Sequence, residues 1–469
     1  MSGEQRFPAD FVWGAATAAY QIEGAAAMDG RTPSIWDTFS RKPGAVIGDD
    51  TGDVACDHYH RFVDDVALMA DLGLAAYRFS VSWSRVQPGG SGPANEKGLD
   101  FYRRLVDELL AHGVEPWLTL YHWDLPQELE DAGGWPVRDT AHRFADYAGL
   151  MFDAIGDRVK HWSTLNEPFC SSLLGYASGE HAPGRAEPPA AVAAVHHLLL
   201  AHGLGLAAIR ARSSDVRAGL ALNFTPVVPL DPNDPADVDA ARRIDGLHNR
   251  LFIEAVRNGA YPRDVVADLG PYGLAGHVQD GDMALISAPI DEMGVNFYTT
   301  NVVSAQPDPN PPVSDIVTPS PPGTIWVGSE DVNFRTTERP VTDQGWEINP
   351  AGLTELLIWI GKNYPDVPLY VTENGAAFDA PVVDGRVDDT DRIAYLAGHV
   401  SAVHDAITAG VDVRGYFAWS LLDNFEWAWG YGQRFGIVHV DFETQQRIPK
   451  ASAHWYAKTI AANALTLPE

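Results

Sequence analysis

The sequence has little of what several large protein classes require. Only two cysteines, Cys56 and Cys170, occur in 469 residues, so a disulfide-rich secreted scaffold is excluded. Lys and Arg total 33 against 63 Asp and Glu, a formal net charge of −30, which argues against nucleic acid or an anionic membrane as a partner. No basic segment followed by an apolar one opens the chain, and the longest apolar run, 198–208, is shorter than a membrane span and contains His202. We therefore expect a cytoplasmic protein with free thiols and no membrane or nucleic-acid partner, and its self-association into a homo-oligomer stays open.

Apolar residues are plentiful, at 45% of the chain, and they follow a repeated order of helix, glycine and buried strand. Helical spacing over 57–72 ends at Gly73, and the spacing over 99–112 ends at Gly113; a strand-like apolar segment follows each glycine. A third case, at Gly410, occurs late in the chain. This order is typical of the βα alternation of a parallel sheet.

Eight segments qualify as strands. They are 11–17, 75–83, 114–123, 160–165, 217–224, 290–297, 367–372 and 411–420. The further helices predicted between them are 138–155, 189–212, 238–257, 350–364 and 391–408. Eight βα units predict an α/β fold with a single (β/α)8 TIM barrel and extended βα loops, because open doubly wound sheets rarely use so many strands. Segment 303–344, rich in Pro, Ser and Asp, is predicted to be a long loop, and residues 1–469 a single domain.

Polar and aromatic side chains follow the ends of these strands, where barrels carry their active sites. They are Gln21, Arg78, His122, Trp123, Asn166, Glu167, Asn223, Asn296, Tyr298, Glu373 and Trp419. Capping or packing could explain any one of these side chains. It does not easily explain why eight consecutive strands all end in such groups. Two are carboxylates, Glu167 in TLNEP and Glu373 in TENG, and a carboxyl pair among aromatic rings suits glycoside hydrolysis. An ionised Glu373 would help to keep Glu167 protonated.

Eight motifs carry a resemblance to a known family, in which they occur in the same order along the chain. They are TLNEP, TENG, FVWGAATAAYQIEGA, YRFSVSWSR, LYHWDLP, GVNFYT, AWSLLDNFEW and GYGQRFGIVHVDFETQQRIPK. With them the chain resembles the retaining β-glucosidases of glycoside hydrolase family 1 over about residues 7–458. The resemblance implies that Glu373 is the nucleophile and Glu167 the acid and then the base, with carboxyls about 5–5.5 Å apart. It also implies that Tyr298 donates to Glu373 and that the 419–420 peptide is cis.

By the same resemblance, a set of side chains binds the substrate: Gln21, His122, Trp123, Asn166, Asn296, Tyr298, Trp346, Trp419, Glu426 and Trp427. Arg78 and Asn223 would support them, with Arg78 keeping Glu373 ionised and Trp346 flanking the aglycone. For four further residues, lining of the entrance and packing are equally open: Phe169, Cys170, Leu174 and His181. Glu426 stands where the phospho-glycosidase branch of the family has serine, which favours an unphosphorylated sugar.

The expected activity is hydrolysis of cellobiose, short cello-oligosaccharides and aryl or alkyl β-glucosides by double displacement. Side activity on β-galactosides and β-fucosides is expected, the partner is a small-molecule β-glycoside, and no cofactor or metal is implied. One alternative is a catalytically inactive sugar-binding barrel. Another is a metal-dependent barrel hydrolase, suggested by His58 and His60, although these residues open a helix rather than end a strand.

Overall fold

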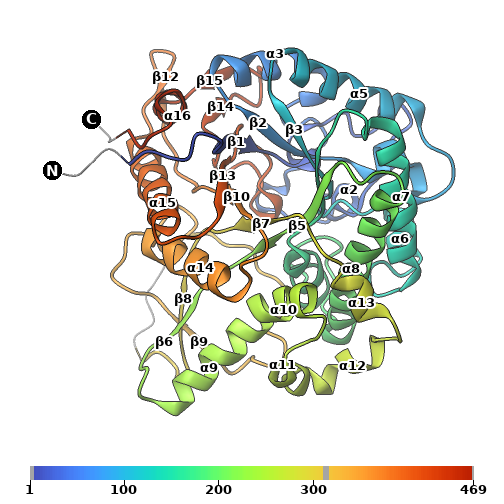
Figure 1. Ribbon diagram of the computed structural model, residues 1–469, viewed down its shortest axis with the longest axis vertical. Helices are drawn as coiled ribbons and strands as arrows, with labels where there is room; N and C mark the ends of the chain where they lie inside the picture. The colour runs from blue at the N-terminus through green and yellow to red at the C-terminus, as the bar shows by residue number, and fades with distance from the viewer. Residues whose placement is uncertain (1–4, 310–315, 467–469) are drawn as a thin grey trace.

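Eight parallel strands form a closed barrel in a computed structural model that describes residues 5–309 and 316–466 (Figure 1). The strands are β1 (Val12–Ala16), β2 (Ala76–Ser80), β3 (Glu115–Tyr121), β4 (His161–Asn166), β5 (Arg217–Asn223), β7 (Glu292–Asn296), β10 (Leu369–Asn374) and β13 (Val413–Trp419). Each pairs with the next barrel strand along the chain, and β13 returns to β1 with Trp13 opposite Tyr416. The predicted (β/α)8 barrel is confirmed, with strand ends that differ from the predictions by up to three residues.

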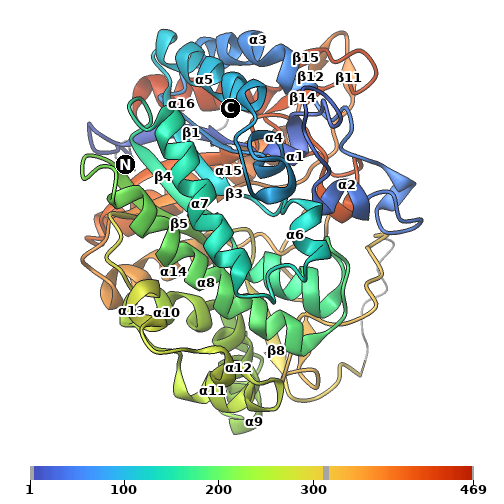
Figure 2. The same cartoon turned by 90° about the vertical axis from the view of Figure 1, so that its right-hand side faces the viewer.

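Helices follow the strands and surround the barrel (Figures 1 and 2). The long ones are α3 (His58–Asp71), α5 (Glu96–Ala111), α7 (Asp139–Ile155), α8 (Pro188–Arg210), α9 (Pro235–Asp245), α10 (Leu251–Asn258), α14 (Pro350–Asn363), α15 (Thr390–Thr408) and α16 (Ala451–Ala462). The turns from α3 and α5 into the next strand use Gly73 and Gly113, with φ of 74° and 73°. Because that left-handed conformation favours glycine, these residues end the helices as the sequence predicts.

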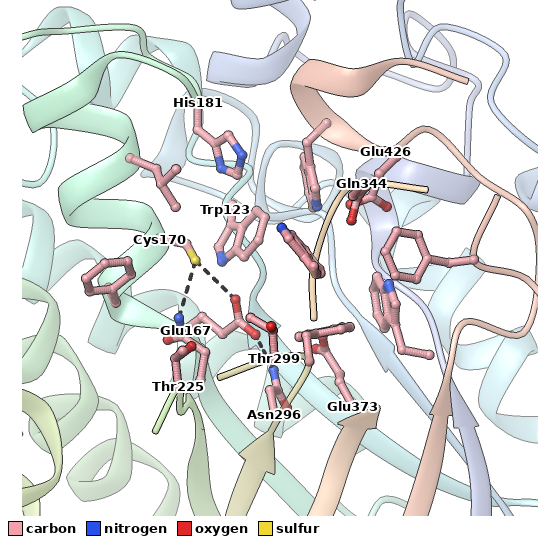
Figure 3. Close-up of a pocket in the computed structure, with 18 of the residues that line it drawn as sticks. Trp123, Glu167, Cys170, His181, Thr225, Asn296, Thr299, Gln344, Glu373 and Glu426 are labelled. Carbon is pink, nitrogen blue, oxygen red and sulfur yellow. Dashed lines mark hydrogen bonds between the residues drawn. The ribbon is translucent and has the colours of Figure 1, made fainter. Parts of the chain in front are cut away.

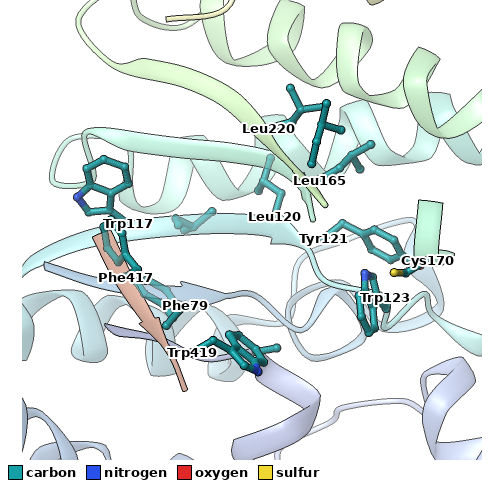
Figure 4. Packing of buried hydrophobic residues seen from close by; sticks show 14 of the residues in the cluster. Phe79, Trp117, Leu120, Tyr121, Trp123, Leu165, Cys170, Leu220, Phe417 and Trp419 are labelled. Atoms are coloured by element: carbon teal, nitrogen blue, oxygen red, sulfur yellow. The ribbon is translucent and has the colours of Figure 1, made fainter. Parts of the chain in front are cut away.

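The barrel interior away from the site is filled by large rings. Trp117 of β3 lies 4.7 Å from Tyr370 and 5.0 Å from Phe417, measured between ring centroids (Figure 4). Leu120 of β3, Leu165 of β4 and Leu220 of β5 are buried in the same core cluster, which continues to the helices (Figure 4). This close packing fixes the strands and therefore the side chains at their ends.

Helix α8 is long and apolar enough to cross a membrane by length and composition, with a mean hydropathy of 1.7 in its most apolar window. Yet 83% of that window is buried inside the protein. It packs against α7 and the π-helix that follows β4. Its apolar character is therefore that of a core helix, and His196, His197 and His202 within it are buried as well.

Segment 238–257, predicted as one helix, contains a π-helical turn, Gly246–Arg250, between α9 and α10. A second π-helix, Cys170–Ser178, follows β4 directly. Each π turn carries one extra residue, which redirects the side chains beside it. His248 and Cys170 thereby reach the same cavity at the barrel end.

Segment 303–344 is not wholly a loop, which corrects the sequence interpretation. Short strand β9 (Asn333–Arg335) lies within it and pairs with β8 (Asn301–Ser304), which runs into its start; β8 also pairs with β6 (Val227–Pro229), giving a three-stranded sheet. These strands are too short to show an alternating pattern, so local sequence could not reveal them. Residues 310–315 of the predicted loop lie outside the described residues.

Other small elements complete the fold. Two hairpins pair β11 (Val382–Val383) with β12 (Arg386–Val387) and β14 (Val438–Val440) with β15 (Arg447–Pro449). Short helices are α1 (Ala19–Ile22), α2 (Ile35–Phe39), α4 (Trp83–Val86), α6 (Gln127–Asp131), α11 (Arg263–Asp268), α12 (Leu274–His277) and α13 (Asp282–Ile286). The two described ends of the chain meet in a bridge between Arg6 and Ala464. Cys56 and Cys170 are both free, as predicted, and both are buried.

Candidate active site

Glu373 lies at the end of β10 with both carboxylate oxygens held. Arg78 Nη1 donates to Oε1 at 2.6 Å, and the Tyr298 hydroxyl donates to Oε2 at 2.7 Å. The other arm of the Arg78 guanidinium donates to Asn166 Oδ1 at 2.6 Å. The predicted contacts of Arg78 and Tyr298 with Glu373 are confirmed. Two charge-assisted bonds fix the carboxylate plane and favour its ionised form.

Glu167 follows β4 immediately and has a φ of 47°, an uncommon backbone conformation for a residue with a side chain. Asn296 Nδ2 donates to Glu167 Oε1 at 2.6 Å. Thr372 Oγ1 donates to Asn296 Oδ1 at 2.6 Å, which orients that amide with its nitrogen toward Glu167. Cys170 Sγ lies 3.1 Å from the other oxygen, Oε2 (Figure 3). Among the residues that the structure describes, Glu167 therefore has polar partners on both oxygens but no cation bonded to it.

The two carboxyls differ in their surroundings. Burial raises the pKa of both. For Glu373, the charge of Arg78 and the Tyr298 hydrogen bond oppose this rise. For Glu167, the negative charge of Glu373 raises the pKa further. A single proton on the pair is therefore favoured on Glu167, because Arg78 and Tyr298 favour the ionised form of Glu373.

A second group of polar side chains lies beside the carboxyls. Gln21 Nε2 donates to Glu426 Oε2 at 3.3 Å and to the Phe425 carbonyl at 2.9 Å. His122 Nε2 accepts from Asn166 Nδ2 at 3.0 Å, and burial together with Arg78 lowers the pKa of His122, so its imidazole is neutral. Within the described residues, Gln21 Oε1 and His122 Nδ1 are buried without a hydrogen-bond partner. Such groups can bind hydroxyls of a ligand.

Indole rings surround these groups. Trp123 and Trp427 lie 4.5 Å apart between ring centroids, and His122 stacks on Trp419 and Trp427 at 5.8 and 5.9 Å. The peptide from Trp419 to Ser420 is cis, as the resemblance implies. On the other side of the site, Trp346 packs against Tyr298 at 5.5 Å. Flat apolar rings beside hydroxyl-binding groups are typical of a sugar site.

These side chains line one cavity of about 200 Å³ (Figure 3). The predicted residues that line it are His122, Trp123, Glu167, Asn223, Asn296, Tyr298, Trp346, Glu373, Trp419, Glu426 and Trp427, and the four uncertain ones, Phe169, Cys170, Leu174 and His181, line it too. Gln21, Arg78 and Asn166 stand behind the lining and bond to residues within it. The structure thus gathers the whole predicted set, while the role of each residue stays a prediction.

Sequence reasoning missed other lining residues, among them Glu180, Gln344 and His248. Gln344 is buried, and neither its amide nitrogen nor its oxygen has a partner in the described part of the chain. Burial raises the pKa of Glu180 to about 6. All three come from loops or a π turn rather than from strand ends. The only signals were their proximity in sequence to predicted residues, Glu180 beside His181 and Gln344 near Trp346.

His58 and His60 do not form a metal site. His58 Nδ1 lies 2.7 Å from Asp65 Oδ2, and His60 Nδ1 lies 2.6 Å from Asp57 Oδ1, both on or next to α3. Across residues 5–309 and 316–466, no group of three or more His, Cys, Asp or Glu side chains could hold a metal ion. The metal-dependent alternative therefore has no ligand set in these ranges.

Known proteins are similar to this chain in sequence and in architecture. The model of glycosyl hydrolase family 1 matches residues 3–465. The thermostable β-glucosidase B of Thermobispora bispora is 49% identical over 466 residues, covering 99% of this chain and 92% of the relative. The bifunctional β-D-glucosidase/β-D-fucosidase of Bifidobacterium breve is 48% identical, covering 97% and 98%. The crystal structure of a psychrophilic β-glucosidase from Micrococcus antarcticus superposes with a TM-score of 0.96 at 53% identity, covering 98% of each chain. The chain therefore belongs to glycosyl hydrolase family 1.

Proposed function

We propose that the protein is a retaining β-glucosidase that releases terminal non-reducing β-D-glucosyl residues. One observation carries the proposal: two buried carboxyls line the same cavity, Glu373 bonded to Arg78 and Tyr298, and Glu167 bonded in the described part of the chain to an amide and a thiol but to no cation. The relatives named as β-glucosidases support the substrate class. The separation of about 5–5.5 Å between the two carboxyls remains a prediction of this mechanism.

The reaction proceeds in two displacements. In the first, a Glu373 oxygen attacks the anomeric carbon, the bond to the aglycone oxygen breaks, and Glu167 gives its proton to that oxygen. A covalent glycosyl-enzyme results. In the second, the Glu167 carboxylate takes a proton from water, whose oxygen attacks the anomeric carbon and releases Glu373. Two inversions return the β configuration.

The sugar is held from the side opposite the aglycone. Gln21, His122 and Glu426 would bind its hydroxyls, and the Trp419 ring would pack against its apolar face. Burial and the charge of Glu373 raise the pKa of Glu426 to about 8, so near neutral pH this carboxyl can donate as well as accept. A carboxyl group here disfavours a phosphorylated sugar. Trp346 would contact the aglycone.

Cellobiose, short cello-oligosaccharides and aryl or alkyl β-glucosides are the substrates we propose, with side activity on β-galactosides and β-fucosides. The last is supported by the relative named as a bifunctional glucosidase and fucosidase. The two free, buried thiols support a cytoplasmic location. Matched kinetics on 4-nitrophenyl β-glucoside, β-galactoside and β-fucoside and on cellobiose would rank these substrates.

Replacing the nucleophile tests the mechanism. Glu373→Ala is expected to lower kcat for 4-nitrophenyl β-glucoside by on the order of 10⁴-fold or more, because no covalent intermediate can form. Glu128→Ala, at an exposed position on α6, is the matched control and should retain full activity. Proton NMR of the wild-type reaction should show β-glucose before α-glucose.

Near wild-type turnover by Glu373→Ala would refute the mechanism. Glucoside binding by the wild-type protein without any turnover would instead favour the inactive sugar-binding barrel.

A further inference from the structure

The proposed acid/base carboxyl has a thiol as its nearest neighbour on one side. Cys170 follows Glu167 by three residues, at the start of the π-helix after β4. Its Sγ lies 3.1 Å from Glu167 Oε2 (Figure 3), and its side chain is buried at 7% exposure. The close contact follows from the backbone itself, because the left-handed conformation of Glu167 turns the chain directly into the π-helix.

The hydrogen bonds around Cys170 show which neighbour its thiol donates to and which it accepts from. Asn223 Nδ2 faces the sulfur at 3.8 Å and also lies 3.2 Å from His248 Nε2. An amide nitrogen only donates, so the sulfur is the acceptor on that side and its own hydrogen is left for Glu167. Burial raises the pKa of the Cys170 thiol well above its usual value, with the charge of Glu167 acting in the same direction. The group is therefore a neutral S–H donor and not a nucleophile.

We propose that Cys170 is a positioning residue for acid/base catalysis, whose thiol holds Glu167 Oε2 while Asn296 holds Oε1. Two partners on opposite oxygens fix the carboxyl plane, so that the oxygen carrying the proton is presented to the aglycone oxygen. Both partners donate, but the amide N–H at Oε1 is the stronger donor and the S–H at Oε2 the weaker one, so the proton of the acid form is placed more easily on Oε2, beside the sulfur. This inference rests on the proposed function, because it requires Glu167 to be the acid.

The thiol also acts on the charge of its neighbour. Its bond to the carboxylate lowers the pKa of Glu167, against burial and the charge of Glu373, which raise it. The other charged or titratable groups that act on Glu167 or lie in the same cavity are Arg78, Tyr298, Glu426, Glu180, His122, His181 and His248. None of these groups is removed when Cys170 is replaced, so a change in the dependence of kcat/KM on pH can be assigned to the thiol.

The test compares Cys170→Ala with Cys170→Ser on aryl β-glucosides of graded leaving ability. For phenyl β-glucoside, whose departure needs protonation, Cys170→Ala should lower kcat/KM by on the order of tenfold. For 2,4-dinitrophenyl β-glucoside, which leaves with little acid assistance, kcat/KM should stay within about twofold of wild type. Cys170→Ser keeps a donor and nearly the volume, so it should recover most of the loss on the phenyl substrate.

The pH profile gives a second readout that simple packing would not move. Hydrolysis needs protonated Glu167, so activity falls as pH rises through its pKa. Loss of the thiol bond raises that pKa, and the alkaline limb of kcat/KM should move to higher pH by roughly half a unit in Cys170→Ala. The matched control is Cys56→Ala, which removes a buried thiol bonded to the Asp423 carbonyl and should move neither the limb nor the leaving-group dependence.

Two results would overturn the proposal. One is an equal loss of kcat/KM on both substrates with an unmoved alkaline limb. The other is an additional loss when Cys170→Ala is placed in a Glu167→Ala background, where no carboxyl remains to be positioned. Thermal unfolding of each variant identifies any that is unfolded, and Cys170→Ser then carries the comparison. If Glu167→Ala itself spares phenyl β-glucoside, the acid assignment fails and the role of Cys170 fails with it. If Glu167→Ala loses activity on phenyl β-glucoside but Cys170→Ala does not, the role of Cys170 alone fails.

Discussion

At the scale of single residues, one arginine organises the whole site. Arg78 donates to Glu373 with one nitrogen and to Asn166 with the other, and Asn166 in turn bonds His122. The proposed nucleophile Glu373 and the proposed sugar-binding residue His122 are therefore linked through a single planar guanidinium, which lysine could not replace because it lacks the fork of donors.

The position of each site residue relative to the barrel strands explains whether it could be predicted from the sequence. Glu373, Glu167, Asn296 and Arg78 belong to barrel strands or directly follow one, so the strand pattern placed them at one end of the barrel. The contact between Cys170 and Glu167 depends on a π-helix, and no sequence pattern signals the extra residue in its turn. Glu180 and Gln344 lie on loops whose path is set by tertiary packing alone.

Tyr298→Phe tests how Glu373, the proposed nucleophile, is kept ionised. The Tyr298 hydroxyl donates to Glu373 and lowers its pKa, so its loss should raise that pKa and move the acid limb of kcat/KM to higher pH. At the pH optimum, kcat/KM should fall by roughly 10- to 100-fold, because the donor also orients the attacking oxygen. Steady-state kinetics on 4-nitrophenyl β-glucoside between pH 4 and about 9 would measure both effects.

The control is Tyr456→Phe, which removes a buried hydroxyl that donates to the Gly14 carbonyl from α16. It should leave the acid limb in place. An unmoved limb in Tyr298→Phe as well would show that Arg78 alone sets the charge of Glu373.

At the scale of elements, the two ends of the barrel strands have different tasks. The carboxyl ends carry the site, whereas the starts of β3, β4 and β7 carry a partly buried ionic cluster. His161 Nδ1 lies 2.8 Å from Glu292 Oε2, and Nε2 lies 3.5 Å from Glu115 Oε1. The imidazole stacks on Trp117 at 3.7 Å between ring centroids, nearly parallel at 7°. A cation is thus held between two carboxylates and an aromatic face.

This cluster should make stability depend on pH. Burial lowers the pKa of His161, but the hydrogen bonds and charges of Glu115 and Glu292 outweigh it and raise the pKa to about 9. The stabilisation is fully present below the unfolded pKa of about 6.5 and is lost as pH rises through 9. His161→Gln should therefore reduce the free energy of unfolding by about 2 kcal/mol at pH 6 and by little near pH 10. The value at pH 6 is lower than the full pKa shift implies, because Glu115 is 44% exposed and solvent screens its charge.

Urea denaturation across that pH range would measure the effect, and His60→Gln, at an exposed position of α3, is the control. Equal destabilisation of His161→Gln at pH 6 and pH 10 would mean that His161 acts through packing on Trp117 instead.

Elements also mark where sequence prediction ends. Each barrel strand was predictable because it is a buried apolar run followed by a helix or loop with its own pattern. The sheet of β6, β8 and β9 was not, since its strands have three or four residues and pair across long distances in the sequence. The break between α9 and α10 was hidden because the apolar spacing continues through Gly246–Arg250, with Leu247 and Leu251 both buried.

At the scale of the whole molecule, the charge of the chain and the lining of the cavity have the same sign. The net charge is −30, and four carboxyls line the cavity: Glu167, Glu180, Glu373 and Glu426. Burial and the charge of Glu373 raise the pKa of Glu167 and of Glu426 to about 8, so near neutral pH the negative charge in the cavity is that of Glu373 and Glu180. Arg78, which stands behind the lining, is already bonded to Glu373. Burial raises the pKa of Glu180 only to about 6, so this carboxyl is ionised at pH 7.5. The entrance is therefore electrostatically negative, and an anionic aglycone should be disfavoured both on approach and in the cavity.

A matched pair of substrates isolates this effect: 4-carboxyphenyl β-glucoside and its neutral carboxamide analogue. At pH 7.5 and about 10 mM ionic strength, kcat/KM for the carboxylate should be lower than for the carboxamide by on the order of tenfold. At about 0.5 M salt, this ratio of the carboxamide kcat/KM to the carboxylate kcat/KM should fall to roughly threefold, because exposed charges are screened while buried ones are screened less.

Glu180→Gln should reduce the ratio measured at low salt, whereas Glu128→Gln, which changes the net charge equally at a position outside the cavity, should not. Lowering the pH through 6 in the wild type should narrow the ratio in the same way as Glu180 takes up a proton. A ratio that is independent of salt and of Glu180 would show that the cavity discriminates between aglycones by shape and not by charge.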